Sequence, residues 1–398
     1  MPERSAAGVS AAPAVAVPAV GERELRLDLF RGMALWLIFI DHLPPNILTW
    51  FTLRNYGFSD ATEIFIFISG YTAAFVYGRA MLNSGFVIAS ARILRRVWQI
   101  YVAHVFLFTI FLAEISYVAT SFENPLYTEE MGIMDFLKQP DVTIFQALIL
   151  RFKPVNMDVL PLYIMLLVGF SPVLWLLLRA PSMALIGSAV VYALMYKFGW
   201  NIPAYPNGVW VFNPFAWQLL FVFGAWCALG GAKRLALVVN SRVTVALAVA
   251  YLGFAFFVAM TWYFPRVAVF LPRIIGDNIY PIDKTNLDVL RILHFLSLAV
   301  LVVNLVPRDW PALRSPIFGP AILCGQHSLA IFCLGVFLAF AGHFVFTEVS
   351  NRLLTHVIVS AVGIGVMVAT AAVLTWYKNI ERGPRPPAAR PGFAGGDA

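Results

Sequence analysis

Charged residues are scarce in this chain. Asp, Glu, Lys and Arg make up only 12% of its 398 residues, whereas about 25% is usual for soluble domains. The sequence also lacks ten-residue strands of alternating polarity, the signature of a membrane β-barrel. The chain therefore fits neither an ordinary soluble enzyme nor a barrel, and its 60% of hydrophobic residues needs another explanation.

Cysteine is nearly lacking too. Cys227, Cys324 and Cys333 all lie in apolar stretches, where we expect small buried side chains and no disulfides. No CxxC or HExxH motif occurs in the sequence, so we expect no metal cofactor. Internal repeats, which mark many transporters, are also missing. The sequence thus gives no sign of metal, haem or nucleotide-hydrolysing machinery.

What the chain has instead is a series of apolar runs, each long enough to span a bilayer as a helix. The ten runs are 29–46, 60–79, 97–118, 158–178, 182–199, 212–231, 243–264, 288–306, 320–345 and 354–377. We expect an all-α, polytopic membrane protein with ten transmembrane helices around a polar passage. This domain covers 24–380, between tails at 1–23 and 381–398 that are predicted to be disordered, the first without the pattern of a cleaved signal.

The net charge of +7 indicates orientation in a membrane more than nucleic-acid binding. If the N-terminus and every second loop lie on one side, that side holds 18 of the 28 Lys and Arg residues. The positive-inside rule then places both termini in the cytoplasm. We expect a multi-pass protein of the bacterial inner membrane, in contact with membrane lipid and without a nucleic-acid partner.

The loops predicted on the opposite side are longer and richer in aromatic and polar residues. They cover 119–157, 200–211 and 265–287. Such loops suit a carbohydrate ligand, because its CH faces stack on rings while its hydroxyls need donors and acceptors. An interfacial belt of Trp and Tyr is the alternative interpretation.

The first apolar run carries unusual ionisable residues. Arg31 and His42 are eleven residues apart, so they share one helix face with Asp28, and His42 lies roughly 16 Å deeper. We predict that His42 is a general base for a hydroxyl, with Asp41 nearby to orient or stabilise the ring. Asp41 points about 100° away on a regular helix, however. A structural histidine at the end of the run is the alternative.

Two further clusters flank the next runs. Asp60 and Glu63 are one helical turn apart and could share a face; N-capping accounts for Asp60 but less well for Glu63. Arg92, Arg95 and Arg96 occur at i, i+3 and i+4 and could bind the phosphates of coenzyme A. Positive charge that only flanks the membrane is the alternative for these arginines.

Weaker candidates for substrate binding interrupt the later runs. Together with Asp28 and Asp60 they are Asp158, Asn213, Gln218, Arg291, His294, Gln326 and His327. Each alone is more often a packing contact between helices. Together they predict a polar interior, as a membrane enzyme or a transporter requires.

Several segments resemble a known family when they are taken in order. The pattern LDLFRG…DH, then SDATEIFIFISGY, then ARILRRVWQIYVAH, with GQHSLAIF later, resembles the integral-membrane acyltransferases of acyltransferase family three. More specifically, DATEIFIFISGYTAAFVYGR, MDVLPLYIMLL, NPFAWQLLFVFGAW and LRILHFLSLAVLV resemble the OpgC family. The resemblance runs from about Glu24 to Tyr377.

This resemblance implies an O-acyltransferase that succinylates osmoregulated periplasmic glucans with cytoplasmic succinyl-CoA as the acyl donor. It implies that His42 is the catalytic base, with Asp41 or Glu63 as its partner. The arginines it assigns to donor binding are Arg31, Arg92, Arg95 and Arg96. Arg291 is one candidate to pair with the free succinyl carboxylate.

Three alternatives stay open at this point. Acetyl could replace succinyl in an O-acetyltransferase of another cell-envelope glycan. A glucan transporter without enzymatic activity would have a similar polar passage. The acyl group could pass directly in a ternary complex or through a covalent intermediate on His42. The oligomeric state and the length and linkage of the glucan stay open as well.

Overall fold

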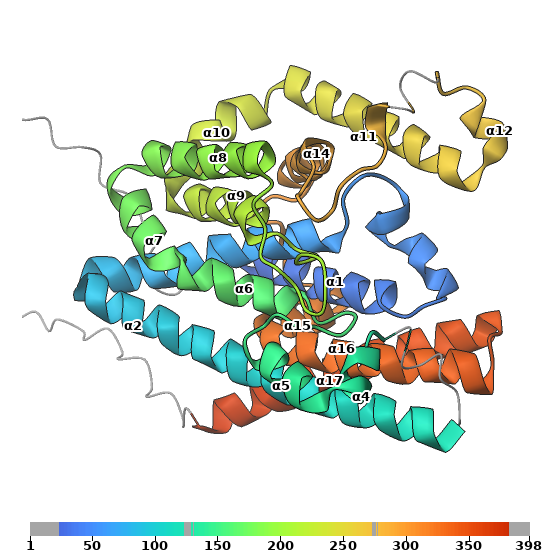
Figure 1. Cartoon of the computed structure of the whole chain (residues 1–398). Helices are drawn as coiled ribbons and strands as arrows, with labels where there is room; N and C mark the ends of the chain where they lie inside the picture. Colours follow the sequence, from blue (N-terminus) through green and yellow to red (C-terminus); the bar gives the residue numbers. More distant parts are fainter. Residues whose placement is uncertain (1–23, 123–128, 130, 273–275, 277, 382–398) are drawn as a thin grey trace, which may run out of the picture.

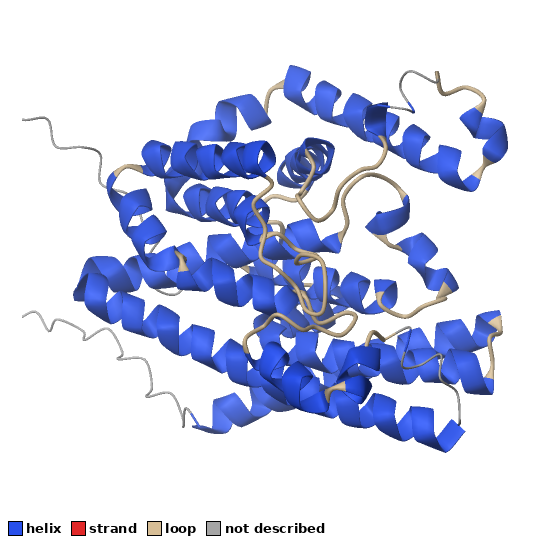
Figure 2. Ribbon diagram, viewed as in Figure 1, coloured by secondary structure: helices blue, strands red, loops and turns tan. Residues whose placement is uncertain are grey.

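The computed structural model describes residues 24–122, 129, 131–272, 276 and 278–381. Within these ranges the chain consists of helices and loops and contains no β-strand (Figure 2). The all-α prediction is therefore confirmed for the described part of the chain. The predicted tails, except for Glu381, lie outside the described residues.

Each predicted apolar run coincides with helical structure. The helices are α1 (Leu25–Asp41), α2 (Ala61–Phe122), α4 (Met134–Lys138), α5 (Pro140–Leu148), α6 (Val159–Val168), α7 (Phe170–Arg179), α8 (Pro181–Phe198), α9 (Pro214–Trp226), α10 (Ala232–Val239), α11 (Arg242–Tyr263), α12 (Pro265–Ala268), α14 (Val289–Leu305), α15 (Gly319–Gln326), α16 (Ser328–Phe344) and α17 (Leu353–Glu381). Short 3₁₀ turns, among them Ile47–Phe51 and Leu53–Asn55, join α1 to α2.

The prediction of ten membrane-spanning helices is not confirmed. Among the described residues, six helices are long and apolar enough to cross a bilayer, or seven if the pair α6 and α7, bent by 54°, is one span. Two predicted runs lie in α2, which is interrupted only at Gly85, where φ is 82°. The remaining difference arises because α1 and α14 have only 17 residues each.

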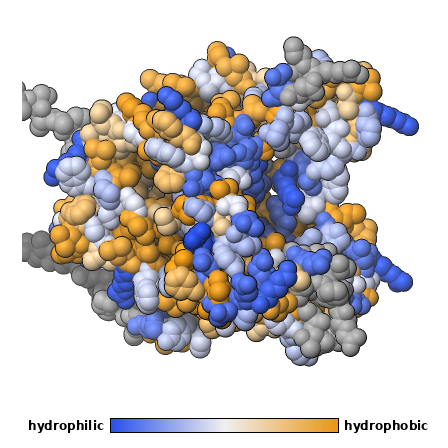
Figure 3. All heavy atoms as spheres, in the orientation of Figure 1, coloured by the Kyte–Doolittle hydropathy of each residue, from blue (hydrophilic) through white to orange (hydrophobic). Residues whose placement is uncertain are grey.

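Most of the long helices run along one common direction (Figure 1). The end of α1, the residues that lead into α2, the tip of α11 and the start of α17 lie on the right of this view, and the bend of α2 lies on the left. Figure 3 shows hydrophilic residues in the middle of this face and around a hollow to its right, among apolar residues that cover much of the surface.

Glycines allow the central helices to pack with their backbones in contact. A Cβ on Gly32 of α1 would meet the carbonyl of Ala321 in α15, and one on Gly224 of α9 would meet the carbonyl of Phe67 in α2. Gly70 of α2 approaches α9 equally closely. Small residues at helix crossings are a common device in membrane proteins, because apolar lipid gives little hydrophobic drive for association. These crossings hold α1 and α2 in place, and both helices carry site residues.

Candidate active site

His42 lies at the C-terminal end of α1, where it caps the helix. Its Nδ1 is 2.5 Å from the backbone carbonyl oxygen of Ile38. A carbonyl oxygen can only accept a hydrogen bond, so the neutral ring carries its proton on Nδ1 and leaves Nε2 as an acceptor. An imidazole in this tautomer can take a proton from a hydroxyl group.

A polar cavity of about 310 Å³, which we call the outer cavity, opens beside His42. Its charged lining residues are Asp41, Arg54, Asp60, Lys284 and Arg291. Three cations thus face two carboxylates, and the excess is positive. Such a cavity suits a ligand with hydroxyl groups and a negative charge.

The base of the outer cavity is built on a buried ion cluster. The guanidinium of Arg291 lies 2.6 Å from Glu63 Oε1 and 3.2 Å from Asp60 Oδ2, and Lys284 Nζ lies 2.5 Å from Asp60 Oδ2. Glu63 also accepts from the backbone N–H of Asp60, while Asp60 accepts from that of Thr62. Glu63 therefore has both roles: it caps α2 and it pairs with a buried cation.

These cations determine the charge of Asp60, which precedes the first residue of the membrane-spanning helix α2. Burial alone would raise the pKa of Asp60, but Lys284 and Arg291 outweigh this effect and hold its pKa below the ordinary value. Asp60 is thus a fixed carboxylate at neutral pH. Its charge holds the ammonium of Lys284 at the edge of the cavity.

Asp41 and Glu63 were predicted as partners of His42, but their hydrogen bonds go elsewhere. Asp41 accepts from the hydroxyl of Thr52 at 2.7 Å, and Glu63 is held by Arg291. Among the described residues, the hydrogen bond of the His42 ring runs to the Ile38 carbonyl and to no carboxylate. Asp41 nevertheless lines the same cavity as His42.

A narrow apolar constriction lies on the other side of His42. It has a volume of only about 10 Å³ and is lined by His42, Leu35, Phe39, Phe332 and Val336, among others. Phe332 also lines the next cavity, so the constriction separates two polar spaces. The polar passage expected from the sequence is thus closed at its middle in this structure.

The second polar space, which we call the inner cavity, has a volume of about 260 Å³. Arg31 lines it and is fixed by Asp28 at 3.4 Å, by the carbonyl of Gly325 and by the hydroxyl of Thr72. Arg31 and His42 therefore face different cavities from opposite parts of α1, as their spacing along one helix face predicts.

The inner cavity divides the predicted arginine cluster. Arg96 lines the cavity, whereas Arg92 and Arg95 are exposed on α2 and are not among its lining residues. Gln326 lines the same cavity, but His327 does not, and its Nε2 lies 2.7 Å from the hydroxyl of Thr375. The structure thus brings Arg31, Arg96 and Gln326 together.

The other predicted substrate residues support the site from outside it. Asn213 caps α9 and donates to Asn286, and Gln218 bonds to Ser188 of α8. His294 Nδ1 lies 2.6 Å from the Ser59 hydroxyl. None of these side chains lines the outer or the inner cavity.

Asp158 precedes α6 and lies 4.0 Å from Lys153. Burial raises the pKa of Asp158 to about 6, although Lys153 opposes this shift. Burial also lowers the pKa of Lys153 to about 8, against the opposite effect of Asp158. Both groups are therefore charged only between about pH 6 and pH 8, so this pair is a weak ionic contact beside the site.

Sequence reasoning missed Arg54 and Lys284, which line the outer cavity. Both lie in loops, and Lys284 reaches Asp60 across 224 positions of sequence. The only signal was the charge of these residues in loops predicted on the same side of the membrane. Their meeting depends on the packing of helices that are distant in sequence.

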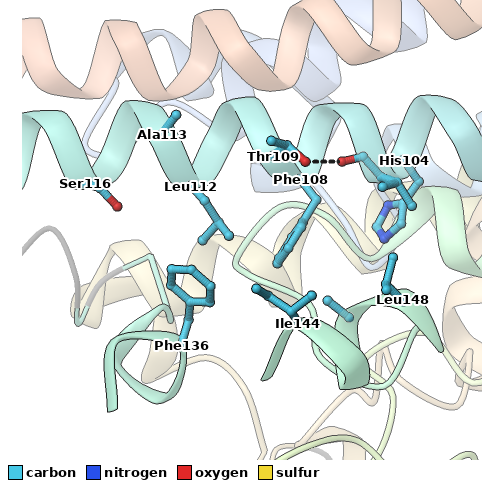
Figure 4. Close-up of a pocket in the computed structure, with 11 residues that line it drawn as sticks. His104, Phe108, Thr109, Leu112, Ala113, Ser116, Phe136, Ile144 and Leu148 are labelled. Carbon is cyan, nitrogen blue, oxygen red and sulfur yellow. Dashed lines mark hydrogen bonds between the residues drawn. The ribbon is translucent and has the colours of Figure 1, made fainter. Parts of the chain in front are cut away.

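A further cavity of about 380 Å³ is mainly apolar. In Figure 4, Phe136 of α4 and Ile144 and Leu148 of α5 face Phe108 and Leu112 on the second half of α2. No acidic, lysine or arginine side chain lines this cavity, so it offers little for phosphate or hydroxyl recognition. The candidate active site is therefore the region of His42 with the outer and inner cavities.

Comparison with known proteins found one family model, and the residues it matches include this region. A family model described as OpgC protein matches residues 23–379. No curated protein and no solved structure matches the chain.

Proposed function

The chain belongs to the OpgC family, and from this premise we propose that it transfers a succinyl group from cytoplasmic succinyl-CoA to hydroxyl groups of osmoregulated periplasmic glucans. The observation that carries the proposal is the position of His42. Its ring lines both the outer cavity and the constriction that leads toward Arg31 and Arg96. A base between an acceptor cavity and a donor cavity suits acyl transfer.

The proposal includes a membrane arrangement. The protein is a multi-pass enzyme of the bacterial inner membrane, with ten helical segments, both termini in the cytoplasm and a place among the integral-membrane acyltransferases. The outer cavity then opens toward the periplasm and the inner cavity toward the cytoplasm. This orientation puts the arginines on the side where the positive-inside rule favours them.

The chemical step follows from the tautomer of His42. Nε2 takes the proton of a glucan hydroxyl while the hydroxyl oxygen attacks the thioester carbonyl carbon of the donor. The C–S bond then breaks, the thiolate of coenzyme A takes the proton from the imidazolium, and a succinyl ester remains on the sugar. The acyl group passes directly from donor to acceptor. The constriction must widen by movement of Leu35 and Phe332 before the thioester can reach His42.

In this arrangement the donor enters from the inner cavity and its thioester carbon lies at His42. The free carboxylate of the succinyl group lies beyond that carbon and therefore extends into the outer cavity. Arg291 was predicted as its partner, but Arg291 is held by two carboxylates and its side chain is only 9% exposed. The Lys284 side chain is 40% exposed and has one carboxylate partner. Lys284 is therefore better placed to bind the succinyl carboxylate.

We expect Lys284→Met to lower kcat/KM for succinyl-CoA by about 10–100-fold, because a charge-assisted hydrogen bond contributes about 1.5–3 kcal/mol. The kcat/KM for acetyl-CoA, which lacks the carboxylate, should fall much less. The measurement is thiol release with each donor at saturating glucan, beside Lys197→Met as a control in α8. Equal losses of kcat/KM with both donors would show that Lys284 only pairs with Asp60 and does not bind the succinyl carboxylate.

The inner cavity predicts a difference among three neighbouring arginines. We expect Arg96→Gln to raise the KM for succinyl-CoA by about tenfold with little change in kcat, because a phosphate contact made in the ground state affects binding. Arg92→Gln and Arg95→Gln should change this KM less than about twofold, since exposed charges contribute little. Equal effects of the three variants would indicate that these arginines only flank the membrane and do not bind the donor.

The experiment that tests the proposed function is the release of free thiol by the purified protein. It uses succinyl-CoA or acetyl-CoA, with and without osmoregulated periplasmic glucan. Glucan-dependent release that favours succinyl-CoA supports the proposal. Preference for acetyl-CoA would favour an acetyltransferase, absence of release with either donor would favour a transporter, and a burst of thiol without glucan would indicate a covalent intermediate on His42.

A further inference from the structure

A larger polar cavity adjoins the outer cavity. It has a volume of about 630 Å³, against about 310 Å³ for the outer cavity, and we call it the lateral cavity. The two cavities share Asp41 and Arg54 as lining residues. A ligand chain in the lateral cavity can therefore reach past these side chains toward His42.

Aromatic rings form one wall of the lateral cavity. Trp50 and Tyr263 have ring centroids 4.5 Å apart at an interplanar angle of 58°. The hydroxyl of Tyr263 donates to Asn55 at 2.8 Å, which fixes the ring, while the residue stays 42% exposed. Fixed and accessible rings offer an apolar face with a polar tip, as the CH face of a pyranose requires.

The charged groups of the lateral cavity match hydroxyl groups better than ions. Asp41 only accepts hydrogen bonds and Arg54 only donates them, and both line the cavity. Thr52 occupies one oxygen of Asp41, and Arg54 makes one bond, to the carbonyl of Asp41. A hydroxyl both donates and accepts, so it can bind either residue, whereas an ion of either sign would be repelled by one of them.

The walls of this cavity are held in place before any ligand binds. The amide of Asn46 donates to Ser360 of α17 at 2.9 Å, and the backbone N–H of Ile47 donates to His356 Nδ1 at 3.1 Å. His356 Nε2 therefore carries the proton that it donates to Asn351 at 2.6 Å. These bonds fasten the loop after α1 to the start of α17, so binding need not order the loop.

We propose that the lateral cavity is the acceptor subsite: it binds neutral glucose units of the glucan next to the unit that reacts, stacked on Trp50 and Tyr263. This inference rests on the proposed function, since it takes the glucan as the acceptor. The outer cavity then holds the reacting hydroxyl and the succinyl carboxylate. The lateral cavity supplies most of the affinity for the acceptor chain.

The test is equilibrium dialysis of labelled osmoregulated periplasmic glucan against the full-length protein in detergent, without an acyl donor. We expect Trp50→Leu to weaken glucan binding by about tenfold, or about 1.4 kcal/mol, because it removes one of the two rings on which the sugar stacks. Tyr263→Leu is a second variant with the same expectation. Trp262→Leu is the matched control, since Trp262 neighbours Tyr263 but packs on Tyr280 and does not line the cavity.

The acyl-transfer assay is run beside the dialysis. Under the proposal, Trp50→Leu raises the KM for glucan and leaves the KM for succinyl-CoA unchanged. Glucan binding that equals wild type in Trp50→Leu and Tyr263→Leu, or no binding by the wild type, would overturn the subsite. Weakened binding without any thiol release would support the subsite and reject acyl transfer, so the two failures are distinguishable.

Discussion

We expect His42→Ala to lower glucan-dependent thiol release by about 10²–10⁴-fold, the usual contribution of a positioned general base. The reason is the tautomer fixed by the Ile38 carbonyl, which leaves Nε2 as the proton acceptor beside the outer cavity. The measurement is the initial rate of thiol release from succinyl-CoA with saturating glucan. The KM for succinyl-CoA should change little, because the inner cavity is untouched.

His327→Ala is the matched control for this prediction. It removes another imidazole, at the break between α15 and α16, which bonds to Thr375 and lines neither cavity. Thermal unfolding in the same detergent should show both variants folded. Normal turnover by a folded His42→Ala protein would remove His42 from the mechanism.

The second large effect concerns stability. We expect Arg291→Met to lower the free energy of unfolding by about 3–5 kcal/mol, as is typical when one partner of a buried ion pair is removed. The change leaves Glu63, which is fully buried, and Asp60 without their shared guanidinium. Denaturant or thermal unfolding of the purified protein at fixed detergent and pH measures this loss.

Two further variants test whether the loss of stability comes from the carboxylates left unpaired or merely from the loss of an arginine side chain. Adding Glu63→Gln to Arg291→Met should recover part of the stability, because it removes one buried charge. Arg308→Met breaks a pair with Glu24 in which the arginine side chain is 52% exposed, so its cost should be about 0–1 kcal/mol. An Arg291→Met protein as stable as Arg308→Met would show that the buried cluster contributes little to folding.

Local features of the fold were predictable from the sequence. Apolar runs identified helices such as α8, α11 and α17 because length and hydropathy are properties of the segment itself. The spacing of Arg31 and His42 placed them on one helix face at different depths, since helix geometry alone determines this. That each lines a different cavity is known only from the structure. The number of spanning helices was not predictable, because α2 continues through two runs with one break at Gly85.

The partners of the site residues could not be predicted. The proximity of Asp60 and Glu63 was visible from their spacing, but their partner Arg291 is 228 positions from Glu63. Only the packing of α14 against the start of α2 brings that guanidinium to the cluster. The rings of Trp50 and Tyr263 meet for the same reason, across a loop and the end of α11. Such contacts depend on the tertiary arrangement and leave no periodic signal in the sequence.

The constriction beside His42 has a bioenergetic consequence. Its space of about 10 Å³ hardly admits one water molecule, and its walls are the buried side chains of Leu35, Phe39 and Phe332. A continuous water column through an energised membrane would carry protons and short-circuit the membrane potential. These aromatic and aliphatic side chains interrupt such a column, so under the proposed function the outer and inner cavities can both hold water while the gradient across the membrane is preserved.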